Sequence, residues 1–125
     1  MPNVEYTGAA GLNHTTGTGG FSISDAPLLQ EQETITTTVA AQAANAFGAT
    51  NIIGVGGNGG ITLANGSGLG QEKVLVMTDA TASVVVTVAN HEDGAATELT
   101  FAVVDEAVVL VWQGSYWFSL INTIA

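Results

Sequence analysis

The sequence predicts an all-β protein, an antiparallel sandwich or barrel of the jelly-roll type, on three observations. Short runs of β-branched and aromatic residues recur about every 8–12 residues, and Gly, Asn and Asp turn residues lie between them. Only 10% of the residues are charged, against roughly 25% in ordinary soluble domains. Thr, Ser, Asn, Gln, Gly and Ala replace charge on the surface, a mixture that suits strands, turns and contacts with other proteins.

A chain of 125 residues has the length of one compact domain. We expect an extended N-terminal arm over residues 1–20 and a single β domain over residues 21–125. Gly8–Gly20 has hardly any apolar side chain, so few contacts offset an ordering entropy of about 1–2 kcal/mol per residue. The arm is expected to become ordered only against a partner, and the alternative is a disordered terminus. Its candidate anchors are Val4, Tyr6 and Phe21.

The first half of the domain is predicted to hold one strand and one short apolar run. Thr34–Val39 is β-branched throughout and predicts a strand. Ala40–Ala46 contains good helix formers, and the sequence leaves open whether it forms a short helix or a loop. Ile52–Val55 is apolar, and Gly56–Gly60 must be a turn or loop because so many glycines cannot hold a regular element.

The second half shows a regular succession of strands and turns, which is typical of a sandwich or barrel. Strands are predicted at Ile61–Leu63, Lys73–Thr78, Val84–Val88, Glu98–Phe101, Ala107–Trp112 and Ser115–Ile121. Polar or glycine-containing turns are predicted between them at Asn65–Gly68, Asp79–Ala82 and Asn90–Gly94.

The last two strands form the clearest element, a β-hairpin. Val108–Trp112 and Tyr116–Ile121 flank Gln113–Ser115, a short connection in which Gly114 can take a left-handed conformation. Both strands are apolar on both faces, which is unusual for an antiparallel pair with one wet side. We therefore expect the second face to be covered, either by the N-terminal half of the chain or by a neighbouring subunit.

The charge balance excludes several functions. Eleven carboxylates stand against one basic side chain, Lys73, and the formal net charge is -10. Nucleic-acid binding depends on Lys and Arg that release counterions from phosphates, so no nucleic-acid partner is expected. No stretch approaches the roughly 18 apolar residues that cross a bilayer, and we expect no membrane association. Because Cys is absent, no disulfide or thiolate metal site is expected.

No motif in the sequence predicts an enzyme or a cofactor. Gly54–Gly60 superficially resembles a phosphate-binding loop, but the strand-like Ile61–Leu63 follows it where such a loop needs a helix N-terminus. No Ser lies in a Gly-x-Ser-x-Gly setting, so a hydrolase triad has no support. Asp105 and Glu106 lie at the predicted turn before the hairpin, and we expect both to be solvated.

The two histidines, His14 and His91, have no second His at metal-ligand spacing. His91 lies beside Glu92 and Asp93, and we interpret this polar stretch as a solvated loop rather than a cation site or a catalytic base. The aromatic side chains of the hairpin, Trp112, Tyr116 and Trp117, are interpreted as core or subunit interface, with a sugar-stacking platform as the alternative.

Four segments together carry a resemblance to a known class of proteins. These are Ile61–Leu63, Gly70–Val76, Val84–Val88 and Val109–Trp117. Their arrangement resembles the small β-rich structural modules of tailed-bacteriophage virions, which recur in capsid decoration (cement) proteins and in tail-fibre segments, commonly as homotrimers. The resemblance covers roughly residues 61–121, and the first sixty residues depart from it.

The resemblance implies a mechanical function. Tail fibres are usually long chains of several modules, whereas this chain starts at its own Met1 and carries a bare arm, so we expect a capsid decoration protein. Such a protein would be a homotrimer that binds the major capsid protein on the outer surface of the phage head and stabilises the expanded shell. The alternative is a tail-fibre or surface-appendage module that binds a host receptor or glycan. The expected contact residues, on the capsid or between subunits, are Val4, Tyr6, Phe21, Trp112, Tyr116 and Trp117.

Overall fold

The computed structural model describes residues 32–56, 59–92 and 95–124, and within them the chain forms nine strands and no helix. The strands are β1 (Gln32–Thr36), β2 (Gln42–Ala44), β3 (Gly48–Gly54), β4 (Ile61–Leu63), β5 (Glu72–Ala80), β6 (Val84–His91), β7 (Ala95–Phe101), β8 (Ala107–Trp112) and β9 (Trp117–Asn122). The all-β prediction is confirmed. In this part of the chain no helix exists with the length and apolar character of a bilayer span.

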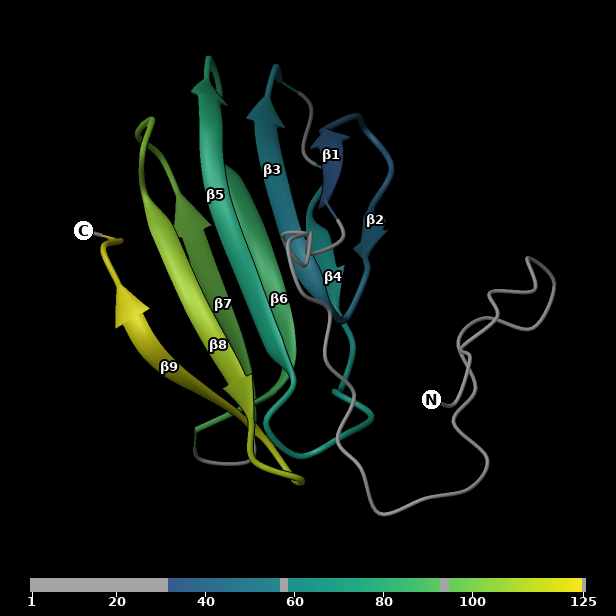
Figure 1. Cartoon of the computed structure of the whole chain (residues 1–125). Helices are drawn as coiled ribbons and strands as arrows, with labels where there is room; N and C mark the ends of the chain where they lie inside the picture. The colour runs from purple at the N-terminus through teal and green to yellow at the C-terminus, as the bar shows by residue number, and fades with distance from the viewer. Residues whose placement is uncertain (1–31, 57–58, 93–94, 125) are drawn as a thin grey trace, which may run out of the picture.

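The strands lie in two layers between which the chain alternates (Figure 1). One layer, which we call the first layer, contains β1, β3, β5, β8 and β9, and the second layer contains β2, β4, β6 and β7. Because each odd strand up to β5 is followed by a strand in the opposite layer, the chain winds as a flattened coil. The strand in the opposite layer serves as the crossover that parallel pairing requires.

The pairing differs from the antiparallel arrangement that we expected. β1–β3, β3–β5, β2–β4 and β4–β6 are all parallel, whereas β5–β8, β6–β7 and β8–β9 are antiparallel. The two layers join where His91 at the end of β6 meets Trp117 at the start of β9. This junction makes the nine strands one sheet that closes almost into a barrel, with β1 and β2 at its two ends.

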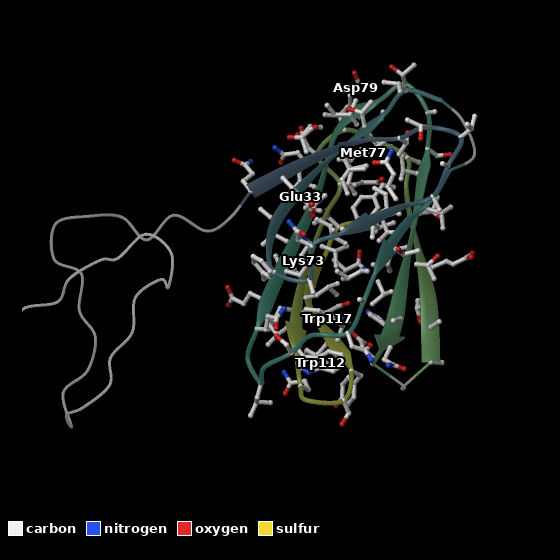
Figure 2. The ribbon with its side chains drawn as sticks, turned by 90° about the vertical axis from the view of Figure 1, so that its right-hand side faces the viewer. Glu33, Lys73, Met77, Asp79, Trp112 and Trp117 are labelled. Carbon is white, nitrogen blue, oxygen red and sulfur yellow. The ribbon has the colours of Figure 1, made fainter. Side chains whose placement is uncertain are left out.

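The core fills the space between the layers, and the burial along each strand alternates accordingly. The largest fully buried side chains include Trp117, Lys73, Phe101 and Met77. Figure 2 views the layers from the side and shows Met77, Lys73 and Trp117 one above the other along the length of the interior.

The expected elements can now be compared with the structure. The last hairpin is confirmed, with Val111 opposite Phe118 and Trp112 opposite Trp117. For Ala40–Ala46 the sequence left a short helix or a loop open. The structure shows a third arrangement, in which the middle of the segment forms the three-residue strand β2 against β4. The expected arm, residues 1–20, lies outside the described residues.

Candidate functional site

One surface of the protein is apolar where a water-exposed sheet is usually polar. In the first layer, Ala49, Val74, Val109 and Ile121 align as one row across β3, β5, β8 and β9. A second row runs from Glu72 through Val111 to Phe118, and a third runs from Asn51 through Val76 to Ala107. On β3, β5 and β8 these side chains alternate with buried residues and therefore point away from the interior. Phe118 and Ile121 of β9 stand opposite the outward-pointing Val111 and Val109 of β8 and share their face. We call this surface the outer apolar face, formed by Ala49, Val74, Val76, Val109, Val111, Phe118 and Ile121.

The outer apolar face remains open among the described residues. Its valines are half-buried against each other, while Phe118 is 43% exposed and Ile121 56% exposed. Leu120 is a further exposed apolar residue, placed at a bulge where β9 has one residue more than β8. Burial of apolar surface contributes about 25 cal/mol per Å² of favourable free energy. A partner that covers this face would therefore gain binding free energy from it.

The outer apolar face carries no charge across its middle. On the outer side of β5 the charged residues are Glu72 and Asp79, which lie at opposite ends of the strand. The outer side of the second layer is chemically different, because Thr62, Thr87 and Thr100 point outward there with Glu98. The two outer sides therefore differ in degree. The first layer is mainly aliphatic over β5, β8 and β9, whereas the second layer carries these threonines and Glu98 together with Val85.

The tryptophans predicted as contact residues lie in the core. Trp117 is fully buried and its indole N–H donates to the carbonyl of Ala64 at 3.0 Å. Trp112 is 5% exposed and meets Trp117 edge to face, with ring centroids 5.3 Å apart. Both rings therefore belong to the core, which was one of the alternatives the sequence left open, and neither presents an exposed face to another subunit, a capsid or a sugar. A buried Trp N–H requires an acceptor, and the chain's own backbone supplies it.

The other predicted contact residues are distributed differently. Tyr116 is half-buried, and its carbonyl accepts the Gln113 N–H at 2.9 Å inside the hairpin turn. Val4, Tyr6 and Phe21 lie outside the described residues. Sequence reasoning did not single out Phe118 and Ile121 as exposed apolar residues, although the apolar character of both hairpin faces was the signal that could have found them.

The residues Gly70 and Gln71, which carried part of the resemblance, shape the loop before β5. Gly70 takes a positive φ of 82°, a conformation that favours glycine. The side-chain oxygen of Gln71 accepts the backbone N–H groups of Ser67 and Gly68, and its amide nitrogen donates to the carbonyl of Ala46. Gln71 therefore fixes the loop before β5 and ties it to the connection between β2 and β3.

Lys73 is fully buried, a position that the sequence did not indicate. Its ammonium group lies 3.2 Å from a carboxylate oxygen of Glu33 on β1 and donates to the carbonyl of Phe47 at 3.3 Å. Gly48 stands opposite Lys73 on β3, and because it has no side chain the lysine can cross the strand that separates β5 from β1. The pair joins residues forty positions apart.

The Glu33 carboxylate is stabilised by hydrogen bonds and an ion pair from surrounding protein groups. Burial alone would raise the pKa of Glu33, but hydrogen bonds from the Thr50 hydroxyl and the Asn45 N–H, with the ammonium of Lys73, outweigh it. The net result is a pKa below the usual value, because these groups stabilise the ionised form. Glu33 is therefore a charged structural group on the inner side of β1.

His91 lies at the junction of the layers rather than in a solvated loop, which corrects our expectation. Its Nε2 is 2.8 Å from the Ser119 hydroxyl and 3.9 Å from the Glu92 carboxylate. In a catalytic triad the carboxylate holds the other ring nitrogen, Nδ1, so this geometry differs from a triad. Glu92 also accepts the Ser119 N–H at 3.0 Å, and the three residues fasten β9 to the end of β6.

Glu106 was expected to be solvated, and this prediction is wrong. It is 7% exposed, and its carboxylate accepts the N–H groups of Ala102 and Val103 at 2.6 and 3.0 Å. Asp105 is exposed and has a φ of 72°, an uncommon conformation that Asp tolerates better than most residues. Among the described residues no three Asp, Glu or His side chains lie close enough together to hold a metal ion.

Gly54 has a packing role at the start of the glycine-rich stretch. Its carbonyl accepts the Ala82 N–H at 2.7 Å, and a Cβ at this position would overlap the Ala82 carbonyl oxygen. The glycine therefore allows two backbones to approach closely, and the segment behind it leads into the strand β4. This agrees with the structural interpretation of the loop.

Comparison with known protein families and curated proteins identifies no relative of this chain. No protein-family model matches the sequence, and no curated protein matches it either. The outer apolar face, the buried ion pair and the threonine-bearing opposite side are therefore the observations on which a function can be argued.

Proposed function

We propose that this protein is a virion structural protein, a capsid decoration protein that binds the outer surface of a tailed-phage head as a homotrimer. The observation that carries the proposal is the outer apolar face, a sheet surface that no other described part of the chain covers and that has no charge across its middle. Contiguous exposed apolar surface of this kind marks a contact with another protein. The resemblance of residues 61–121 to phage decoration modules supplies the class of partner, the major capsid protein.

The mechanism would be stabilisation by mass action. A protein that binds only the expanded shell stabilises it by RT ln(1 + [L]/Kd) at each site, about 2.7 kcal/mol when the free concentration is 100 times Kd. A trimer attached at three points gains avidity without any new kind of contact. Many weak attachments would then resist the internal pressure of packaged DNA.

Two measurements test this function. Quantitative mass spectrometry of purified virions should find a copy number comparable with that of the major capsid protein, since a decoration protein covers the head. Shells stripped of the protein should rupture at a lower temperature, and adding the purified protein should restore the rupture temperature. Stripped shells as stable as complete ones, or a copy number typical of a tail component, would contradict the proposal.

A second candidate is the tail-fibre or receptor-binding module. Among the described residues, β1 pairs only with β3 and β2 pairs only with β4, so the coil ends in two strand edges on which another module can stack. The burial of Trp112 and Trp117 removes the aromatic platform that a glycan site would have used. Loss of host adsorption on deletion of the gene, with unchanged shell stability, would favour this candidate.

A further inference from the structure

We propose that residues Phe21–Ile23 form a further strand, which pairs in parallel with the free edge of β2 and extends the second layer by one strand. The inference goes beyond the proposed function and does not depend on it. It commits the edge of β2 to one occupant, a segment of the same chain just upstream of β1. The winding of the chain, the backbone groups at the edge, the sequence of the segment and the length of its connection to β1 all favour this occupant.

The winding of the chain places the preceding strand beside β2. From β1 to β6 successive strands alternate between the layers, so a strand before β1 belongs to the second layer. In that layer each strand pairs in parallel with the next one that the chain adds, β2 with β4 and β4 with β6. The same step taken backwards leads to the other edge of β2, which pairs with no strand among the described residues. Figure 1 shows β1 and β2 together at this end of the coil.

The backbone of Ala43 is directed toward this edge. The Gln42 N–H donates to the Gly60 carbonyl at 3.0 Å, on the side of β4. Successive residues of a strand direct their backbone groups to opposite sides, so the N–H and C=O of Ala43 face away from β4. Such an edge is a template for a further strand. A parallel strand there can accept the Ala43 N–H through the carbonyl of Phe21 and donate the Ile23 N–H to the Ala43 carbonyl.

The sequence of the segment repeats the pattern of the strands that it would join. Ile61–Leu63 and Val86–Val88 each have an apolar, a hydroxyl and an apolar residue in that order, with the hydroxyl residue facing outward between two buried ones. Phe21–Ile23 has the same order. Placed in register with Gln42–Ala44, it directs its two apolar side chains inward and its serine outward. The segment therefore extends the inward rows of the second layer.

The core is less completely covered at β1 and β2 than one strand further in. Ile35 on β1 and Ala44 on β2 are each 7% exposed, whereas Ile52 on β3 and Ile61 on β4 are fully buried. Apolar side chains placed beside Ala44 would remove apolar surface from water at this end of the core, and this burial favours the pairing.

The connection to β1 has the length that the crossing between layers needs. Residues 24–31 are the eight residues between the segment and β1, and residues 64–71 are the eight residues between β4 and β5. The β4–β5 connection makes the same crossing, from the second layer back to the first. With the β2 edge occupied, the stacking of another module there, on which the tail-fibre candidate relies, is blocked. The part of the chain left to reach a partner is then residues 1–20.

Disulfide trapping tests the register, and it suits this chain because the sequence has no Cys. Neighbouring strands lie about 4.8 Å apart, within the Cα separation of about 4.4–6.8 Å that a disulfide spans. Ser22→Cys with Ala43→Cys should therefore form a disulfide within one chain. Ala43→Cys with Thr62→Cys, which stand opposite each other on β2 and β4, is the positive control. Ser22→Cys with Thr87→Cys, which would have β2 and β4 between them, is the negative control.

Non-reducing electrophoresis and mass spectrometry of the mildly oxidised full-length proteins measure the yields. The tested pair should link about as completely as the positive control and roughly tenfold more than the negative control, because only neighbouring strands meet the geometry of a disulfide. A yield no greater than that of the negative control would overturn the proposal. Disulfide-linked dimers in place of internally linked monomers would overturn it too, since the segment would then occupy β2 of another copy.

Hydrogen exchange followed by NMR gives a second readout that needs no cysteine. The Ala43 N–H should be protected in the wild type, because a hydrogen-bonded amide exchanges only after local opening. Ile23→Asp directs a carboxylate into the core and should speed this exchange by about tenfold or more, while the amides of β8 stay protected. Ser22→Asp adds the same charge on the outer side and should leave the rate within about twofold. An unprotected Ala43 N–H in the wild type, or equal acceleration by both variants, would contradict the proposal.

Discussion

The ion pair of Lys73 and Glu33 is asymmetric in its surroundings, and this decides what its removal does. The Lys73 side chain is fully buried, whereas the Glu33 side chain keeps 21% of its surface exposed and accepts further hydrogen bonds from Thr50 and Asn45. Losing the carboxylate removes a counter-charge 3.2 Å from a fully buried ammonium. Losing the ammonium leaves a carboxylate that still has two donors and contact with water.

We therefore expect Glu33→Gln to destabilise the protein more than Lys73→Met. Breaking a buried pair from one side costs about 3–5 kcal/mol, and Glu33→Gln should lie in that range. Lys73→Met replaces the buried ammonium by an apolar chain of similar length and should cost clearly less. Urea unfolding of both variants and the wild type measures the difference, and equal losses would show that the two charges share the same environment.

The pKa of Glu33 predicts a loss of stability in acid. Because the folded-state pKa is below the usual value, the ionised group contributes stability above the unfolded-state pKa of about 4.3. That contribution is lost as the pH falls below this value and through the folded-state pKa. Unfolding free energies measured from pH 6 to pH 3 should fall more steeply for the wild type than for Glu33→Gln. Parallel curves would mean that Glu33 does not titrate differently in the two states.

These buried charges could not be found from the sequence. Lys73 begins an ordinary alternating strand, and nothing in its neighbours reveals a carboxylate forty positions away. Glu106 lies in a stretch with every local feature of a solvated turn, yet its carboxylate caps two backbone N–H groups of the preceding loop. Both roles depend on tertiary contacts, which local patterns do not encode.

The loop before β5 is shaped by the tryptophan beneath it. A Cβ on Gly66 would overlap the ring of Trp112, whereas a Cβ on Gly68 would meet nothing within 4 Å. Both glycines belong to the same turn, and neither has the positive φ that strains other residues. The two positions therefore form a matched pair that differs mainly in the contact with Trp112.

Gly66→Ala is expected to destabilise the protein and Gly68→Ala to leave it nearly unchanged. Forcing a methyl group into a filled site costs about 1–3 kcal/mol, which lowers the midpoint of thermal unfolding by roughly 5 °C or more in a domain of this size. Gly68→Ala should stay within about 0.5 kcal/mol of the wild type. Differential scanning calorimetry of the three proteins measures this, and similar midpoints for both variants would show that Trp112 moves aside.

Strand pairing could be predicted where the two strands that pair are close in sequence. Val108–Trp112 and Tyr116–Ile121 are joined by a short turn, and the structure confirms them as a hairpin. The parallel pairing of β1, β3 and β5 could not be predicted, because each partner lies beyond a strand of the other layer. The strand β2 was missed since its alanines favour a helix, and only its pairing with β4 overrides that preference.

The surface of the whole molecule was predicted in outline. The apolar character of both hairpin strands predicted a second apolar face that something must cover, and Val111 and Phe118 lie on this face in the structure. The sequence assigned contact roles to Trp112 and Trp117 as well, because alternation shows which residues share a face but not which face is interior. Only the position of the second layer fixes that choice.

The charge of the whole chain predicts how self-association responds to salt. Each copy carries a formal charge of -10, and its single Lys is buried, so the copies repel through water and cannot form intermolecular bridges with Lys or Arg. Salt screens this repulsion, with a Debye length of about 10 Å at 0.1 M, and leaves apolar contacts intact. The association constant from sedimentation equilibrium should therefore rise several-fold between 0.05 and 0.5 M NaCl. Association that weakens with salt would require an ionic attraction that this composition cannot supply, and would point to a basic partner in place of a second copy.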